Sequence, residues 1–504
     1  MVNLTNTFYF CTQDYHVIFA SNIIRYGYQP IGFLKNRNNK DILKKIFPNI
    51  KSFEYHDFLK SNLIFSDSYK NIVPINVLNE MNKYFNEYSK ILLRQDTFMP
   101  SISLSNALDI FNSNIQYWYN FFIEKNIQLN IFEEEPHKSN TYLVYQLSKI
   151  MNINTYMPLR TIWQLGIIPI STYENKNNDK LLSELLNSTI SNNLNTDFKN
   201  YINSLTKNYE DVMKHHLWNQ VNDIKENNKN INFNKLSKIT SLFSLKNYSS
   251  DFKTYFSKLE NSKENYFNYL INKVYKLIFI KKLKRNYNIL SKNINITNLK
   301  KKYIYFPLQM QPEKSTLPLG GVFEDSLYTI KFLLKNTPKD LKILIKEHPT
   351  HFIHWRNTTN LMWRSHDFYK KLINLSDRII LIDQKSDVFE LIDNSIFVAS
   401  VGGTVCWEAA IRGKRSLNFS KIWFDNCPGV STIFDETEIE KFIKQKIYDK
   451  EIIKTEVVNF AKKIFDLGYN SAHGNPEELK HLNISPKENA EILKNAFLNY
   501  LQIK

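Results

Sequence analysis

The chain has 504 residues and a formal net charge of +17, and its 43% hydrophobic and 14% aromatic content excludes a disordered protein. Its three cysteines are widely spaced and odd in number, which argues against a disulfide framework and against a zinc cluster. No apolar run is long enough for a transmembrane helix and the first residues do not resemble a signal peptide, so we expect a cytoplasmic protein.

Residues 1–175 alternate short apolar runs with helical patterns, which is typical of a parallel α/β domain. The acidic segment Glu133-Glu-Glu-Pro-His137 follows one predicted strand and precedes an amphipathic helix at 143–151, so it lies at the carboxyl edge of the sheet. Glu135 and His137 are therefore candidates for a general base or nucleophile, although a cluster that caps a helix would look the same. The expected strands are residues 7–11, 29–33, 63–65, 128–132, 155–158 and 167–170.

Residues 176–300 contain no Gly or Pro and show helical periodicity, which predicts a helical insertion. Its second part is strongly basic, because ten Lys or Arg and no Asp or Glu occur between residues 265 and 312. Interleaved aromatic and aliphatic residues over 273–302 suit a helix on an anionic membrane surface at the inner face of the cell membrane. A solvated helix face is the plain alternative, and we expect no nucleic acid partner.

Residues 301–436 again alternate strands and helices and predict a second doubly wound domain, followed by helices over 437–504 that pack back across the domains. The predicted strands are 303–306, 342–346, 378–382, 395–399 and 416–419, and the predicted helices are 323–334 and 388–392.

Polar residues follow the first two of these strands. The loop after residue 306 offers amide and carboxylate groups at Gln309, Gln311 and Glu313, which suit sugar or base recognition, or simply form a long surface loop. Lys346-Glu-His-Pro349 ends the next strand, where Lys346 and His348 could neutralise phosphate. His348 could also stabilise a leaving phosphate as charge builds on its oxygen.

The segment Ser400-Val-Gly-Gly-Thr-Val-Cys-Trp-Glu408 reads as a strand end, a glycine turn and a helix start. Only 11 Gly occur in the chain, so the pair Gly402 and Gly403 marks a place where geometry requires it. Backbone N–H groups beside Thr404 could bind a phosphate, and Glu408, one turn later, could accept ribose hydroxyls. The plain alternative is an ordinary βα turn with an acid in the first helical turn.

Taken in order, these segments resemble the capsule polysaccharide biosynthesis family, which includes Kdo transferases. The resembling residues are Tyr305 to Glu313, Lys346 to Pro349, Ala399 to Ala409 with Gly413-Lys414, Trp423 to Gly429 and, more weakly, Glu135 to His137. The resemblance implies a GT-B fold with two Rossmann-like domains facing a cleft. Cys406, Arg415 and Ser420 depart from the expected small residue, Pro and Gly, which puts the donor's identity in question.

The resemblance further implies a glycosyltransferase of capsular or lipopolysaccharide biosynthesis that moves a sugar from a nucleotide-activated donor, such as CMP-Kdo, to a lipid-linked or glycan acceptor. Alternatives are a polyol-phosphate transferase, a nucleotide-sugar epimerase, or a non-catalytic membrane- or polyanion-binding protein with a degenerate transferase fold. No cofactor or metal is required by this interpretation. The expected catalytic residues are Glu135, His137 and His348, and the expected donor-binding residues are Gln309, Gln311, Glu313, Lys346, Ser400, Gly402, Gly403, Thr404 and Glu408.

Overall fold

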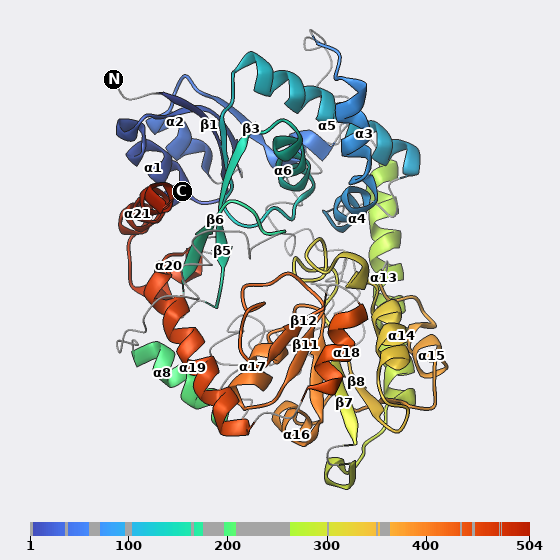
Figure 1. Ribbon diagram of the computed structural model, residues 1–504. Helices are drawn as coiled ribbons and strands as arrows, with labels where there is room; N and C mark the ends of the chain where they lie inside the picture. Colours follow the sequence, from blue (N-terminus) through green and yellow to red (C-terminus); the bar gives the residue numbers. More distant parts are fainter. Residues whose placement is uncertain are drawn as a thin grey trace, which may run out of the picture.

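The structure is a computed structural model, in which two α/β domains lie one above the other (Figure 1). It describes residues 4–35, 39–59, 71–95, 103–162, 166–174, 196–207, 263–299, 302–348, 351–352, 363–433, 436–445, 449–472, 474 and 476–503.

The first sheet has the strand order β3-β2-β1-β4-β5-β6. Its central strand β1 is apolar and buried along most of its length, as expected for a parallel strand that is covered on both faces. The sheet is parallel as predicted except at one edge, where β6 pairs antiparallel with β5. Only six residues join these two strands, which is too few for a parallel crossover. The strands are β1 (Thr5–Cys11), β2 (Tyr28–Lys35), β3 (Lys51–Glu54), β4 (Leu129–Ile131), β5 (Asn154–Arg160) and β6 (Ile167–Ile170).

Helices from both ends of the chain cover this sheet. The last helix, α21 (Pro486–Ile503), packs beside α1, and the ring of Phe497 lies edge-on to those of Phe19, Tyr28 and Tyr156 (Figure 1). Burial of these rings fixes the chain end on the first domain. The other helices of the domain are α1 (Asp14–Asn22), α2 (Lys40–Ile46), α3 (Ile75–Asn82), α4 (Phe85–Gln95), α5 (Leu104–Glu124) and α6 (Ser139–Ile150), with 3₁₀ turns η1 (Ile24–Tyr26) and η3 (Tyr55–Leu59).

The second sheet is parallel throughout and has the order β12-β11-β10-β7-β8-β9. In both sheets the first strand is central and the chain winds outward on both sides, as in dinucleotide-binding domains. Two such domains in one chain confirm the predicted α/β, GT-B-like fold class. The strands are β7 (Tyr303–Pro307), β8 (Lys342–Lys346), β9 (Ile379–Leu381), β10 (Phe397–Ser400), β11 (Ser416–Asn418) and β12 (Val430–Thr432).

The helices of the second domain are α14 (Ser326–Asn336), α15 (Phe368–Ile373), α16 (Val388–Asn394), α17 (Val405–Ile411) and α18 (Glu436–Lys444), with the 3₁₀ turn η9 (Gly321–Glu324). Helices α19 (Lys450–Leu467) and α20 (Pro476–Leu482) then lead back toward the first domain (Figure 1).

The helical insertion predicted over 176–300 lies mostly outside the described residues, as does the strand predicted at 63–65. The described parts are α8 (Thr196–Thr206), α13 (Lys263–Leu290) and η8 (Ile296–Leu299). Helix α8 packs against α17, where Trp407 Nε1 donates to Tyr201 Oη at 3.1 Å. In the described part of the chain, no helix is long and apolar enough to cross a membrane.

Candidate active site

A cavity of about 370 Å³ opens at the carboxyl edge of the second sheet, where open α/β sheets bind ligands. Its size is within the range of small-molecule sites. All of its walls belong to the second domain, so the predicted donor residues gather in one domain while Glu135 and His137 lie elsewhere. The cavity is lined by Tyr305, Pro307, Leu308, Gln309, Lys346, Glu347, His348, Gln384, Lys385, Ser386, Asp387, Val388, Gly403, Thr404, Val405 and Glu408.

The glycine turn has no room for side chains. Gly402 has a φ of +71°, and a Cβ on it would lie 2.9 Å from the carbonyl oxygen of Ser315. A Cβ on Gly403 would lie 2.6 Å from Nε2 of Gln309, which donates to the hydroxyl of Ser400. Gly403 therefore lets the loop after β7 approach the turn after β10. Ser400 and Gly402, which were also predicted to bind the donor, do not line the cavity; they contact the loop after β7 through Gln309 and Ser315.

Glu408 is the acidic residue that α17 contributes to the cavity. Its side chain is 4% exposed and accepts a hydrogen bond from the hydroxyl of Thr404 at 3.0 Å. Burial raises the pKa of Glu408 to about 7, although Thr404 and Arg412 favour the ionised form. Thr404 occupies the N-cap position of α17 but makes no side-chain cap, and its backbone is helical (φ −57°, ψ −17°) instead of extended as in most capping residues.

Lys346 and His348 form the facing wall. Nζ of Lys346 donates to the carbonyl oxygen of Ser386 at 2.6 Å, and burial lowers the pKa of Lys346 to about 8. The carbonyl oxygen of His348 accepts a hydrogen bond from Nε2 of Gln384 at 2.8 Å. Lys346 is thus a largely protonated cation at neutral pH. Among the described residues its ammonium group, which has three donors, bonds to the carbonyl oxygen of Ser386.

Two predicted donor residues lie away from the cavity. The amide of Gln311 is buried and bonded to Arg364, Ser326 and the carbonyl oxygen of Glu324. Glu313 is exposed, and its carbonyl oxygen accepts hydrogen bonds within the loop from the N–H groups of Thr316 and Leu317. Both residues shape the loop after β7 instead of lining the cavity.

The sequence interpretation missed one wall and two supporting residues. Residues 384–388 line the cavity directly after β9, and the rule that ligands bind at carboxyl strand ends could have found them. Glu347 and Arg364 form a fully buried ion pair with Nε to Oε2 at 3.2 Å. No local pattern marks that pair, because the partners lie 17 residues apart in the sequence and meet only in the folded chain.

The three departures from the family pattern also lie outside the cavity lining. Cys406 is buried with its thiol near the carbonyl oxygen of Leu417, at 3.4 Å. The guanidinium of Arg415 binds carbonyl oxygens at the end of α18, and the hydroxyl of Ser420 donates to the carbonyl oxygen of Ser315 at 2.6 Å. These residues therefore act on packing and loop position.

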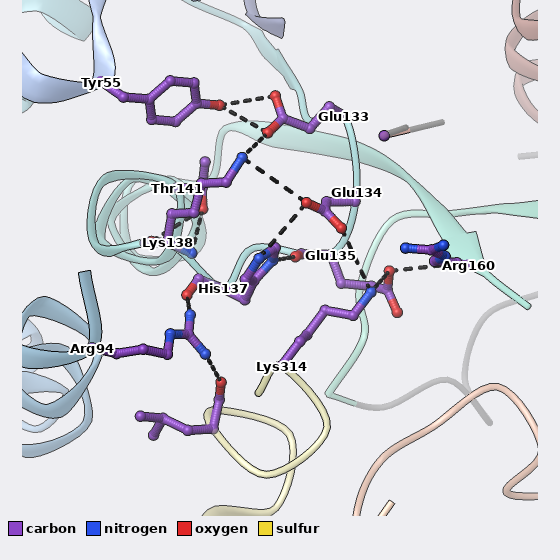
Figure 2. Close-up of polar contacts among 12 residues, drawn as sticks. Tyr55, Arg94, Glu133, Glu134, Glu135, His137, Lys138, Thr141, Arg160 and Lys314 are labelled. Atoms are coloured by element: carbon purple, nitrogen blue, oxygen red, sulfur yellow. Dashed lines mark hydrogen bonds and ion pairs between the residues drawn. The ribbon is translucent and has the colours of Figure 1, made fainter. Parts of the chain in front are cut away.

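The acidic cluster of the first domain meets the second domain through Lys314 (Figure 2). Nζ of Lys314 lies 2.9 Å from Oε2 of Glu135 and 3.8 Å from Oε2 of Glu134. Arg94 of α4 reinforces this contact, since it donates to the carbonyl oxygens of both Leu317 and His137. The loop after β7 thus touches both the cavity and the predicted catalytic cluster.

His137 is uncharged at neutral pH. Burial lowers its pKa to about 4; Glu134 opposes this shift, and the nearby cations Arg94, Lys138 and Lys314 add to it. Nδ1 of His137 lies 3.0 Å from the carbonyl oxygen of Glu135. Because a carbonyl oxygen can only accept, Nδ1 carries the hydrogen and Nε2 holds the lone pair. His137 is therefore a neutral imidazole that could accept a proton on Nε2, which lies 3.7 Å from Oε1 of Glu134 (Figure 2).

Glu133, by contrast, is an internal structural acid. Its carboxylate is 3% exposed and binds Nζ of Lys138 at 2.6 Å and Oη of Tyr55 at 2.8 Å (Figure 2). Within the described residues, no three His, Cys, Asp or Glu side chains are grouped so that they could hold a metal ion.

The chain was compared with solved structures, curated proteins and family models. Among solved structures, the chain is similar to KpsC, a beta Kdo 2,7 transferase of Thermosulfurimonas dismutans, at 12% identity, with 69% of this chain and 80% of that chain covered and a TM-score of 0.31. It is also similar to UDP-GlcNAc 2-epimerase of Methanocaldococcus jannaschii (8% identity, 90% and 99% covered, TM-score 0.25). A third similar structure is the wall teichoic acid polymerase TagF (9% identity, 98% and 88% covered, TM-score 0.22).

A search of curated proteins found no match. A family model described as capsule polysaccharide biosynthesis protein matches residues 203–465, which is more than half of the chain and includes every wall of the cavity. The chain belongs to the capsule polysaccharide biosynthesis protein family.

Proposed function

We propose that this protein is a glycosyltransferase of surface polysaccharide biosynthesis, which transfers a sugar from a nucleotide-activated donor to a lipid-linked or glycan acceptor. The observation that carries the proposal is the composition of the cavity. One space of about 370 Å³ combines a buried cation at Lys346, a glycine turn at Gly403 and Thr404, and a buried carboxyl at Glu408. These groups match a nucleoside diphosphate sugar or a nucleoside monophosphate sugar, whose phosphate suits a cation and a glycine turn and whose ribose suits a carboxyl group.

The donor's chemistry suggests how it would lie. Its phosphate is attracted by the ammonium of Lys346 and the imidazole of His348, and can approach the backbone closely at Gly403. Its ribose hydroxyls are matched by the carboxyl of Glu408. A CMP-activated acidic sugar such as CMP-Kdo remains our proposed donor, on the strength of the family resemblance. The departures at Cys406, Arg415 and Ser420 lie outside the cavity lining and leave that proposal standing.

The acceptor side is proposed at Glu135 and His137. A transfer reaction needs a group that removes the proton of the acceptor hydroxyl or attacks the donor carbon. His137 is neutral with a lone pair on Nε2, and Glu135 is a carboxylate ion-paired to Lys314. His348, across the cavity, would stabilise the charge that develops on the leaving phosphate.

A titration with nucleotides tests the donor site. We expect CMP or UDP to raise the midpoint of thermal unfolding, because a ligand that binds only the folded state stabilises it. The variant His348→Ala should lose this shift, whereas His481→Ala, at an exposed position of α20, should keep it. An unchanged midpoint across a panel of nucleotides and their sugar conjugates would contradict the proposal.

Product analysis separates the alternatives within the same fold. A glycosyltransferase releases nucleotide only when an acceptor is present, apart from slow hydrolysis. An epimerase converts its nucleotide-sugar without an acceptor, and a polyol-phosphate transferase releases nucleotide while moving a phosphate-linked group. Vesicle binding without any nucleotide binding would instead favour a non-catalytic membrane protein.

The outer face of α13 supports a location at the inner surface of the cell membrane. Residues Ile278, Lys282, Arg285 and Ile289 follow helical spacing and share one face, while Phe279, Leu283 and Tyr287 on the opposite face are buried. Ile278 is 61% exposed and Ile289 is 68% exposed. Exposed apolar side chains among cations suit the boundary between lipid headgroups and acyl chains.

Vesicle sedimentation tests this location. We expect the protein to sediment with vesicles that contain phosphatidylglycerol. With vesicles of phosphatidylcholine alone, it should stay in the supernatant. Reversing Lys281, Lys282 and Arg285 to Glu should abolish binding. Reversing Lys40, Lys44 and Lys45 of α2 changes the net charge equally and should leave binding intact. Equal losses in the two variants would mean that net charge alone matters, and would contradict a dedicated face on α13.

A further inference from the structure

The pair Glu347 and Arg364 joins two walls of the cavity from behind. Both side chains are 0% exposed, and Nε of Arg364 lies 3.2 Å from Oε2 of Glu347. Glu347 sits between the cavity residues Lys346 and His348 at the end of β8, whereas Arg364 comes from the segment before α15.

Glu347 holds the backbone of the cavity wall. Its Oε1 accepts the N–H of His348 at 2.8 Å, and its Oε2 also accepts the hydroxyl of Tyr369 at 2.6 Å. The N–H of Glu347 itself donates to Oη of Tyr287 at 3.1 Å. The carboxylate therefore fixes the backbone of His348 relative to α15, and the N–H of Glu347 links the same strand end to α13.

Arg364 holds the loop after β7. One terminal nitrogen donates to the carbonyl oxygen of Gln309 at 3.1 Å, and the other donates to Oε1 of Gln311. The guanidinium also lies 4.5 Å from the ring centre of Phe368. The planar fork of Arg reaches these acceptors and Glu347 at once, which Lys cannot do.

Stability alone gives a poor reason for this arrangement. Replacing a buried ion pair by apolar residues of similar volume is often neutral or stabilising, because the desolvation of two charges offsets their attraction. What the pair provides is a fixed distance between the loop of Gln309 and the strand end at His348. Gln309 in turn contacts Ser400 behind the glycine turn. The loop after β7, the strand end at His348 and the glycine turn therefore all depend on the same ion pair.

We propose that Glu347 and Arg364 are positioning residues, which hold the loop of Gln309 and the backbone of His348 in the geometry that binds the donor nucleotide. This proposal rests on the proposed function, because it assumes that the cavity binds a donor nucleotide. It also gives Gln311 a role: its side chain is an anchor for Arg364 and does not contact the ligand.

The test compares two variants with a matched control. In the double variant Glu347→Leu with Arg364→Met both charges are removed, so no buried charge is left unpaired. The N–H of His348, the hydroxyl of Tyr369 and the carbonyl oxygen of Gln309 lose their partners, so the midpoint of thermal unfolding should fall, as it does in the control below. Its affinity for CMP or UDP, whichever binds wild type more tightly by calorimetry, should fall about tenfold or more, as is typical when the support of a binding residue is lost. In the single variant Arg364→Lys the charge remains but the planar fork is lost, and nucleotide affinity should weaken to the same extent. This variant carries the test if the double variant does not fold.

Arg378 supplies the control. It is also buried, and it binds the carbonyl oxygens of Leu341 and Leu334 and the hydroxyl of Thr337, but it does not line the cavity. Arg378→Met should lower the unfolding midpoint while the folded protein keeps its nucleotide affinity. Amide hydrogen exchange without ligand should show faster exchange at 308–311 and 346–348 in the double variant and in Arg364→Lys, and wild-type exchange there in Arg378→Met.

The outcomes separate the two proposals. Failure of wild type to bind any nucleotide refutes the proposed function, and the exchange comparison still decides the positioning role. Wild-type exchange at 308–311 and 346–348 in a folded variant that lacks the pair, or wild-type nucleotide affinity in that variant, overturns the proposal.

Discussion

Substitution of Glu408 by Gln should make the protein's stability less dependent on pH. The carboxyl of Glu408 is almost fully buried, and burial raises its pKa from 4.5 to about 7. The folded state therefore binds a proton that the unfolded state releases between these values. Stability from this group is fully present below pH 4.5 and is lost as the pH rises through about 7.

The magnitude follows from the two pKa values. Each pH unit between them corresponds to about 1.4 kcal/mol, so the group contributes roughly 3 kcal/mol at low pH. About 2.5 kcal/mol of this is lost between pH 5 and pH 8. Gln keeps the size of the side chain and stays neutral, so the variant lacks this loss.

Urea unfolding of both proteins at several pH values, without ligand, measures the difference. We expect the free energy of unfolding of wild type minus that of Glu408→Gln to fall by about 2.5 kcal/mol from pH 5 to pH 8. A difference that stays constant over this range would show that the carboxyl titrates as an exposed Glu does. A difference that rises with pH would mean that Glu408 is ionised and stabilised in the folded protein, which refutes the reasoning.

Three further predictions concern the same domain. Nucleotide affinity in wild type should fall as the pH rises through about 8, because Lys346 loses the charge that binds phosphate. In Lys346→Arg the affinity should not change over this range. A parallel decline in both proteins would assign the effect to another group. Gly403→Ala places a Cβ 2.6 Å from Nε2 of Gln309, so we expect nucleotide binding to weaken about tenfold with a small change in the unfolding midpoint. Unchanged binding would mean that the loop can yield. Gly413→Ala should lower stability by roughly 1–3 kcal/mol, because its φ is +74° and its Cβ would lie 2.5 Å from the carbonyl oxygen of Lys450; wild-type stability in urea would contradict this.

The interior strands were predictable because their burial leaves a local trace. Strands β7 and β8 are continuous apolar runs, and both predictions are confirmed. The edge strands β3 and β12 were not predicted. They span only four and three residues, most of which are polar and at least partly exposed, and this is too short for a clear period.

The cavity was partly predictable for a similar reason. Lys346 ends β8 and His348 follows it, while Gly403, Thr404 and Glu408 belong to the turn and helix after β10. The topology alone therefore brings them to one edge of the sheet. The direction in which a loop side chain points has no such signal. Gln309 lines the cavity and Gln311 is buried behind it, although both belong to the same polar loop.

Contacts between distant segments could not be predicted from the sequence. The ion pair of Lys314 with Glu135 joins the two domains, and nothing near either residue indicates its partner. The same holds for Glu347 and Arg364, since a buried ion pair depends on how strands and helices pack, and local patterns do not record that packing.

A crystal structure of the protein soaked with CMP, and a second with UDP, tests the central claim most directly. The account predicts that at least one nucleotide occupies the cavity at the carboxyl edge of the second sheet. Its phosphate should lie within hydrogen-bond distance of Lys346 or of the turn at Gly403 and Thr404, and its ribose beside Glu408. A nucleotide bound elsewhere, or an empty cavity at saturating concentrations of both nucleotides, would contradict the account.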